Sequence, residues 1–131
     1  MTLFHALPPS AEPEVLTALK REAGCVAPIA GRIEGVMSLG RGTAIRLASP
    51  ALIALRDRLA DQFHGLLTAQ DAHRPRLHVT VQNKVSPDQA KALQAELAEQ
   101  VEPRDFAFRG LGLYRYRGGP WEHMRDFAFR A

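Results

Sequence analysis

Cysteine is almost absent from this sequence, which has only Cys25 among its 131 residues. A single cysteine cannot form an internal disulfide, so the sequence is not that of a disulfide-stapled secreted module, and a reducing compartment is consistent with it. Long apolar runs are missing as well. No stretch approaches the roughly 18 residues that a membrane-spanning helix needs, and the N terminus has no basic segment followed by a long apolar one. We therefore expect a cytoplasmic protein.

Runs of charge of one sign and clusters of metal ligands are also absent. The net charge is only +3, and the arginines are spread along the chain, so charge indicates only weakly a polyanionic partner such as nucleic acid. No His, Cys or carboxylate cluster has the spacing of a metal site, so we expect neither a metal nor another cofactor. Hydrophobic residues at 46% and charged residues at 24% are typical of one globular domain over residues 1–131.

Residues 77–85 alternate apolar and polar side chains and are rich in β-branched residues, which predicts a β-strand. Successive side chains of a strand point to opposite faces. We therefore expect one buried face, formed by Leu77, Val79 and Val81, and one open face, formed by His78, Thr80 and Gln82. An imidazole and a hydroxyl on one face suit proton transfer and hydrogen bonding to a phosphate ester. The alternative is a half-exposed strand that merely turns polar residues to solvent.

The segments around this strand predict further helices and strands. Residues 1–7 look like a strand stopped by prolines, and a helix with Ser10 as its cap follows to Gly24. Residues 29–47 predict a hairpin that turns at residues 40–42. Ser49 and Pro50 mark the start of an amphipathic helix that reaches Leu66 and should be the longest in the chain. On this helix and in the loop after it, His64 and His73 are interpreted as solvated side chains.

The C-terminal half repeats this order of elements. Ser86 and Gln89 form a capping-box pattern at the start of a helix that ends near residue 101. Residues 105–130 are strand-like, with a turn at Gly118-Gly119-Pro120. The sequence Arg-Asp-Phe-Ala-Phe-Arg occurs at 104–109 and again at 125–130, which suits two strands covering one helical layer.

An internal repeat relates the two halves at a constant offset of about 78 residues. In this alignment Thr2 matches Thr80, and Phe4 matches Gln82. His5 falls on the face opposite Thr2, which favours a structural role. The position that matches His78 falls immediately before Met1. The repeat divides the domain into a first motif unit (1–48), a long helix and loop (49–76) and a second motif unit (77–131), whose equivalent strands we expect to lie side by side.

Three segments together resemble the bacterial 2'-5' RNA ligase-like proteins of the 2H phosphoesterase superfamily, and the resemblance covers essentially the whole chain. They are the strand His78-Val79-Thr80-Val81-Gln82-Asn83-Lys84-Val85, the segment from Thr2 to Pro9, and the tail from Leu113 to Glu122. The resemblance implies an α+β fold in which duplicated antiparallel sheet units form a bilobal groove, with helices on the outside. It also implies metal-independent cleavage or joining of phosphodiesters, such as 2'-5' linkages or 2',3'-cyclic phosphates of RNA-like substrates.

The resemblance implies site residues as well. His78 would be a general acid or base, and Thr80 and Thr2 would donate hydrogen bonds to the phosphate. The matched positions Gln82 and Phe4, together with Tyr114, are predicted to bind substrate. The family's second histidine has no counterpart here, nor do the strand and helix that precede its first motif. We therefore expect an N-terminally incomplete chain with impaired activity, so whether it acts as an enzyme is left open.

An alternative function is a non-catalytic RNA or nucleotide binder that uses the same groove. In that case Tyr114, Tyr116 and Trp121 would stack on bases while arginines contact phosphates. Packing within the final hairpin is the structural explanation for the same aromatic residues. The physiological substrate, the direction of reaction and the oligomeric state do not follow from the sequence.

Overall fold

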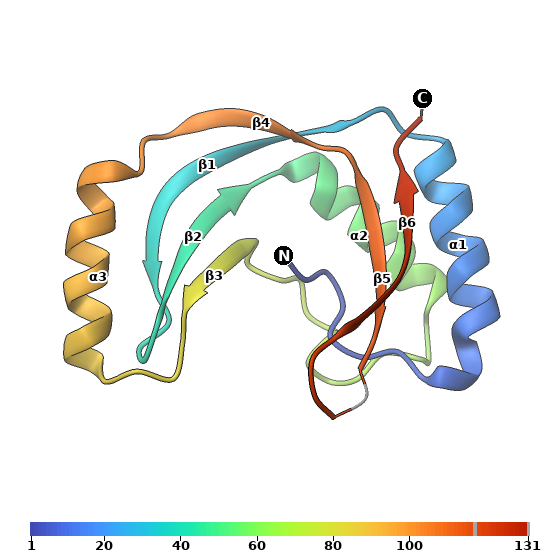
Figure 1. The fold of residues 1–131 in the computed structure, drawn as a ribbon. Helices are drawn as coiled ribbons and strands as arrows, with labels where there is room; N and C mark the ends of the chain where they lie inside the picture. Colours follow the sequence, from blue (N-terminus) through green and yellow to red (C-terminus); the bar gives the residue numbers. More distant parts are fainter. Residues whose placement is uncertain (117, 131) are drawn as a thin grey trace.

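The computed structural model describes residues 1–116 and 118–130, which form three α-helices and two antiparallel sheets (Figure 1). This confirms the predicted α+β class. Arg117, within the tail segment of the predicted motif, lies outside the described residues. A 3-10 turn at Pro9–Ala11 precedes α1 (Glu12–Gly24), β1 (Ile29–Ser38), β2 (Thr43–Ala48), α2 (Pro50–Gln62), β3 (His78–Gln82), α3 (Pro87–Gln100), β4 (Arg104–Phe108), β5 (Gly110–Arg115) and β6 (Glu122–Ala128).

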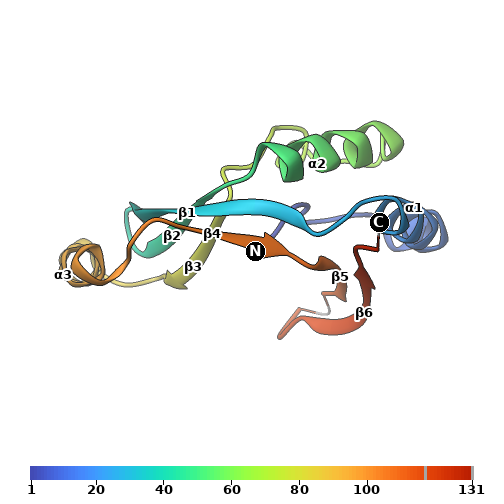
Figure 2. The same ribbon diagram turned by 90° about the horizontal axis from the view of Figure 1, so that it is seen from above.

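The larger sheet has the strand order β3-β2-β1-β4, and β5 pairs only with β6. Figure 2 shows α2 on one side of the larger sheet and the β5–β6 hairpin on the other. α1 and α3 lie at opposite ends of the molecule (Figure 1). One apolar core joins α1, α2 and both sheets, and burying it drives the folding of these elements together. It contains the buried side chains Val15, Leu19, Ile29, Leu47, Leu52, Leu55, Leu59, Phe63, Leu77, Phe127 and Phe129.

Two of the helices begin where the sequence predicts. The Ser49 hydroxyl accepts a hydrogen bond from the backbone N–H of Leu52 at 3.1 Å, and Ser86 and Gln89 form the predicted capping box of α3. The predicted length of α2 is wrong: it ends at Gln62 after 13 residues and is shorter than α3, which has 14. Gly65, with φ of +82°, turns the chain away from the helix.

Residues 1–7 do not form the predicted strand. Their backbone is bonded to a side chain instead: the N–H groups of His5 and Ala6 donate to the carboxylate of Asp71 at 2.8–2.9 Å. The His5 ring bonds the same carboxylate through Nδ1 at 3.0 Å, which fits the structural role inferred for His5. A strand-like segment forms a strand only if a neighbouring strand supplies partners for its backbone, and here a carboxylate satisfies two of the backbone donors.

Strands from the two repeat units pair with each other in the larger sheet. The first hairpin, β1–β2, pairs with β3 of the second unit, because Arg46 of β2 lies opposite His78 of β3. β4, from the second unit, pairs with β1 on the other side. The two copies of Arg-Asp-Phe-Ala-Phe-Arg thus lie in different sheets, and their phenylalanines still contribute to one core. The predicted side-by-side arrangement of residues 1–7 and β3 is wrong, since residues 1–7 are not part of either sheet.

The predicted buried face of β3 is also wrong. Leu77 is buried, but Val79 is 41% and Val81 is 50% exposed. β3 is an edge strand of the larger sheet, so it has a neighbour on one side only. An edge strand at the margin of a small core leaves even its apolar side chains accessible.

Candidate active site

His78 is the first residue of β3, and its ring is held in one orientation. Nδ1 lies 2.6 Å from the backbone carbonyl oxygen of Arg76. A carbonyl only accepts hydrogen bonds, so Nδ1 carries the proton in this contact. The lone pair or proton that can take part in proton transfer is therefore on Nε2. The side chain as a whole is half-buried.

Thr80 follows on the same face, two residues along β3, and is exposed. Across the strand pair, Thr80 lies opposite Ala44, and His78 lies opposite Arg46. Paired residues of antiparallel strands share a face with their Cβ atoms about 5 Å apart. The His78 imidazole, the Thr80 hydroxyl and the Arg46 guanidinium therefore project from one face of two adjacent strands.

Gln82 does not belong to this face. The pairing of β2 with β3 shifts by one residue here, which leaves Val81 without a partner on β2. Gln82 therefore pairs with Thr43, while Thr80 pairs with Ala44. Because Thr43 and Ala44 are successive residues, their partners point to opposite faces. The Thr43 hydroxyl bonds the Gln82 amide oxygen at 3.0 Å, and this buried threonine also donates to the Ala90 carbonyl of α3. Thr43 thus links α3 to the sheet, Gln82 is bonded to that threonine, and the predicted position of Gln82 beside His78 is wrong.

The other three predicted residues lie together elsewhere. Thr2, Phe4 and Tyr114 line a cavity of about 1230 Å³ between the N-terminal segment, α1, α2 and the β5–β6 hairpin. His78 and Thr80 are not among its lining residues. The structure therefore does not bring Thr2 and His78 into one cavity. Phe4 also packs edge-on against Phe63, with ring centroids 5.7 Å apart, so part of its surface belongs to the core.

One face of the β5–β6 hairpin carries four aromatic rings. Tyr114 and His123 are cross-strand partners with ring centroids 5.1 Å apart, and Tyr116 and Trp121 approach to 4.8 Å. Tyr114, Tyr116 and Trp121 are 50%, 61% and 55% exposed, and all three line the large cavity. The rings pack on one another, as the structural explanation predicts, and still present large apolar surfaces to the outside.

A family model described as 2'-5' RNA ligase superfamily matches residues 1–120, which include all six predicted site residues. The chain belongs to the 2'-5' RNA ligase superfamily. The residues that match the superfamily model include both the His78–Thr80 face and the N-terminal segment that lines the cavity. The resemblance seen in the sequence is thereby confirmed.

A solved structure supports the fold of this superfamily member. The crystal structure of TT0787 of Thermus thermophilus matches it with a TM-score of 0.67 and 18% sequence identity. The match covers 97% of this chain and 74% of that one. At this identity the similarity establishes a shared fold and nothing further. A comparison with curated protein sequences finds no match.

Metal ligands do not converge on the site of this superfamily member. Within residues 1–116 and 118–130, no group of three or more His, Cys, Asp or Glu side chains is placed to hold a metal ion. None of the helices in the same ranges has the length and apolar character needed to cross a membrane. The groups that the structure places on the His78 face are an imidazole, a hydroxyl and a guanidinium.

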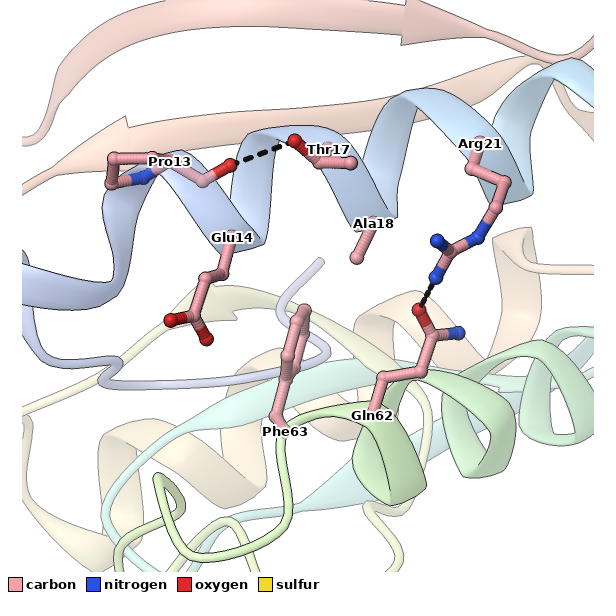
Figure 3. A pocket seen from close by; sticks show the side chains of 7 residues that line it. All are labelled: Pro13, Glu14, Thr17, Ala18, Arg21, Gln62 and Phe63. Atoms are coloured by element: carbon pink, nitrogen blue, oxygen red, sulfur yellow. Dashed lines mark hydrogen bonds between the residues drawn. The ribbon is translucent and has the colours of Figure 1, made fainter.

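A second, smaller cleft lies between α1 and α2 (Figure 3). Its volume is about 500 Å³, and Figure 3 shows Phe63 at its floor and the Arg21 guanidinium bonded to the Gln62 amide. The Thr17 hydroxyl is bonded to the Pro13 carbonyl of its own helix. Among the described residues, no imidazole or thiol lines the cleft, and none of the predicted site residues does, so it adds nothing to the site of this superfamily member.

Sequence analysis missed two residues that position the N-terminal segment, Asp71 and Arg56. Asp71 has a side chain that is only 1% exposed, although it lies in a stretch that looks like a polar loop. Burial by itself raises the pKa of its carboxyl, but hydrogen bonds from the backbone of His5 and Ala6 and from the His5 ring outweigh it, so the pKa lies below 3.8.

Arg56 is buried on α2, bonds the Asp71 carbonyl and covers the Phe4 ring at 4.5 Å. Arg56 lies between Leu55 and Leu59, within the apolar stripe of the helix, and this position in the sequence could have indicated that it is buried.

Proposed function

We propose that this protein is a metal-independent phosphoesterase that hydrolyses RNA 2',3'-cyclic phosphates or related 2'-5' linkages, with His78 as a proton-transfer group. The observation that carries the proposal is the His78 ring, which is held through Nδ1, so that Nε2 is the nitrogen left for proton transfer, two residues from the exposed Thr80. The membership of the 2'-5' RNA ligase superfamily supports RNA as the substrate class. The lone, exposed Cys25 is consistent with a site of action in the reducing cytoplasm.

Hydrolysis of a cyclic phosphate requires one bond to form and one to break. A water oxygen attacks phosphorus, the bond from phosphorus to one ribose oxygen breaks, and the product is a phosphate monoester. His78 can serve one of the two proton transfers through Nε2: as neutral imidazole it accepts the proton of the attacking water, or as imidazolium it gives a proton to the departing ribose oxygen. The Thr80 hydroxyl donates to a non-bridging oxygen, where negative charge accumulates.

A complete cycle uses one proton acceptor and one proton donor. Thr2 lines the large cavity, apart from His78, so the N-terminal segment adds no group to the His78 face in this structure. We therefore propose that one of the two proton transfers relies on water and that turnover is slow. A role for Thr2 as a second phosphate donor requires the N-terminal segment to move toward β3. Phe4 and Tyr114 would then contact the nucleoside part of the substrate.

The direct experiment is to incubate the purified protein with 2',3'-cyclic AMP and with a 2'-5'-linked diadenylate, with and without EDTA. We expect slow formation of a phosphate monoester from the cyclic substrate, at a rate that EDTA does not change. No product from either substrate would contradict the proposed activity. A loss of activity on chelation, restored by one added metal, would contradict its metal-independent mechanism.

The exposed aromatic face of the β5–β6 hairpin supports a second candidate function, the binding of single-stranded RNA without turnover. Tyr116 and Trp121 each have more than half of their surface exposed, and every base offers a face on which such rings can stack. RNA binding of this kind weakens as salt rises, because arginines release counterions from the phosphates. Binding without product formation would favour this function over catalysis.

Trp121→Ala is expected to weaken the binding of a fluorescent oligouridylate by roughly 5- to 100-fold, since stacking on an aromatic ring contributes about 1–3 kcal/mol per base. Trp121→Phe keeps a ring in the same place and should retain most of the affinity. The measurement is fluorescence anisotropy at 50 mM and 200 mM salt. Equal affinities for Trp121→Ala and the unchanged protein would assign the aromatic face to hairpin packing alone.

A further inference from the structure

We propose that Arg46 is the phosphate-binding cation of the His78 face. This inference rests on the proposed phosphoesterase function and names a residue that the sequence motifs do not contain. Arg46 lies in β2, directly opposite His78, so both side chains leave the sheet on the same face. A phosphodiester held by His78 and Thr80 would lie within reach of the guanidinium.

The surroundings of Arg46 leave its charge available. On the side away from His78, Arg46 is paired with Gly35, which has no side chain. The register shifts at this point in β1, and Gly35 has φ of +147°, a conformation that favours glycine. Gly35 therefore places no side chain over the guanidinium, and Arg46 is exposed.

Other arginines of the same sheet differ from Arg46 in partner or in place. Arg32 is paired with Asp105 at 2.8 Å, and Arg41 donates through Nε to the Val85 carbonyl at 3.2 Å. Arg104 is exposed, but it lies on β4, which is the opposite edge strand from β3. Among the described residues, Arg46 has no ion pair and is the arginine paired with His78 in the sheet. Arg76, two residues before His78, precedes β3 and lies outside the sheet.

The chemistry of the proposed reaction needs such a group. Negative charge grows on the non-bridging oxygens in the transition state, and the Thr80 hydroxyl is neutral while the His78 ring changes charge during proton transfer. A guanidinium keeps its positive charge and can donate two parallel hydrogen bonds to two oxygens of one phosphate. Arg46, Thr80 and His78 together form a site for a phosphodiester or a phosphate monoester.

The test uses Arg46→Gln, with Arg104→Gln as the matched control on the same sheet. Inorganic phosphate is the probe, and the imidazole NMR signals of His78 report its binding. We expect Arg46→Gln to raise the dissociation constant for phosphate about 10- to 100-fold and to lower kcat/KM for 2',3'-cyclic AMP by a similar factor. Arg46→Lys should fall between, because it keeps the charge but loses the paired hydrogen bonds. Arg104→Gln should change neither quantity.

The outcomes separate this inference from the proposed function. If phosphate binding at His78 depends on Arg46 but no cyclic phosphate is hydrolysed, the site assignment stands and the proposed activity fails. If hydrolysis depends on His78 but Arg46→Gln behaves like Arg104→Gln, Arg46 has no role and the activity stands. If phosphate does not perturb the His78 signals of the unchanged protein, the proposed site is wrong.

Discussion

Replacing His78 by alanine is expected to lower the rate of 2',3'-cyclic AMP hydrolysis by roughly 100- to 10,000-fold, which is the usual contribution of a positioned proton-transfer group. The Arg76 carbonyl already orients the ring, so the effect does not depend on a rearrangement of the site. The structural cost should be small, because His78 is only half-buried on an edge strand. The loss should appear mainly in kcat, since proton transfer takes place in the transition state.

His73→Ala is the matched control for His78→Ala. His73 is an exposed histidine in the loop that precedes β3, and its replacement should leave the rate unchanged. Both variants should have melting temperatures within a few degrees of the unchanged protein, which would separate a chemical effect from unfolding. Equal rates for His78→Ala and His73→Ala would remove His78 from the mechanism.

Elements determined by local sequence could be predicted. Ser49 with Pro50, and Ser86 with Gln89, specify helix starts through contacts only a few residues apart, and the structure shows both caps. The glycine-rich turn of the β1–β2 hairpin is local in the same sense. The family was also predictable, because its pattern joins a strand motif to the tail motif, and the superfamily match over residues 1–120 confirms it.

Features that depend on distant partners could not be predicted. Residues 1–7 look like a strand, but whether they form one depends on which groups meet their backbone, and Asp71 lies 66 residues from His5. The position of Gln82 depends on one unpaired residue, Val81, because a register shift reverses the face of everything beyond it. The shared face of His78 and Thr80, which precede the shift, was therefore predictable, and the position of Gln82 was not.

The second large effect is expected at Asp71. Asp71→Asn should lower the free energy of unfolding at neutral pH by about 1–3 kcal/mol, because the carboxylate accepts bonds from the His5 and Ala6 backbone and from the His5 ring, and bonds to a charged acceptor are the stronger kind. For a domain of this size the melting temperature should fall by about 4 °C per kcal/mol. Asp61→Asn, at an exposed position of α2, is the control and should have almost no effect.

The Asp71 contribution should depend on pH with a definite sign. The pKa of the folded protein's Asp71 carboxyl lies below the ordinary value of 3.8, so folding favours the charged form. Its stabilisation is complete well above pH 4 and is lost as the pH falls through the lowered pKa. Urea denaturation of the unchanged protein and Asp71→Asn should therefore show a gap that is constant from pH 7 to about pH 5 and narrows at lower pH. A gap that widens on acidification would contradict the assigned cause of the pKa shift.

Asp71→Asn also tests whether the N-terminal segment affects catalysis as well as stability. The segment lines the large cavity with Thr2 and Phe4, and Asp71 is what holds its backbone, so weakening that hold should speed amide exchange at His5 and Ala6 before it affects β3. If the segment must move toward His78 for full activity, Asp71→Asn should raise kcat while lowering stability. If the segment serves only to close the core, the variant should lose stability and keep the kcat of the unchanged protein. Measuring kcat and amide exchange on one sample therefore decides whether Asp71 restrains the active site or only completes the fold.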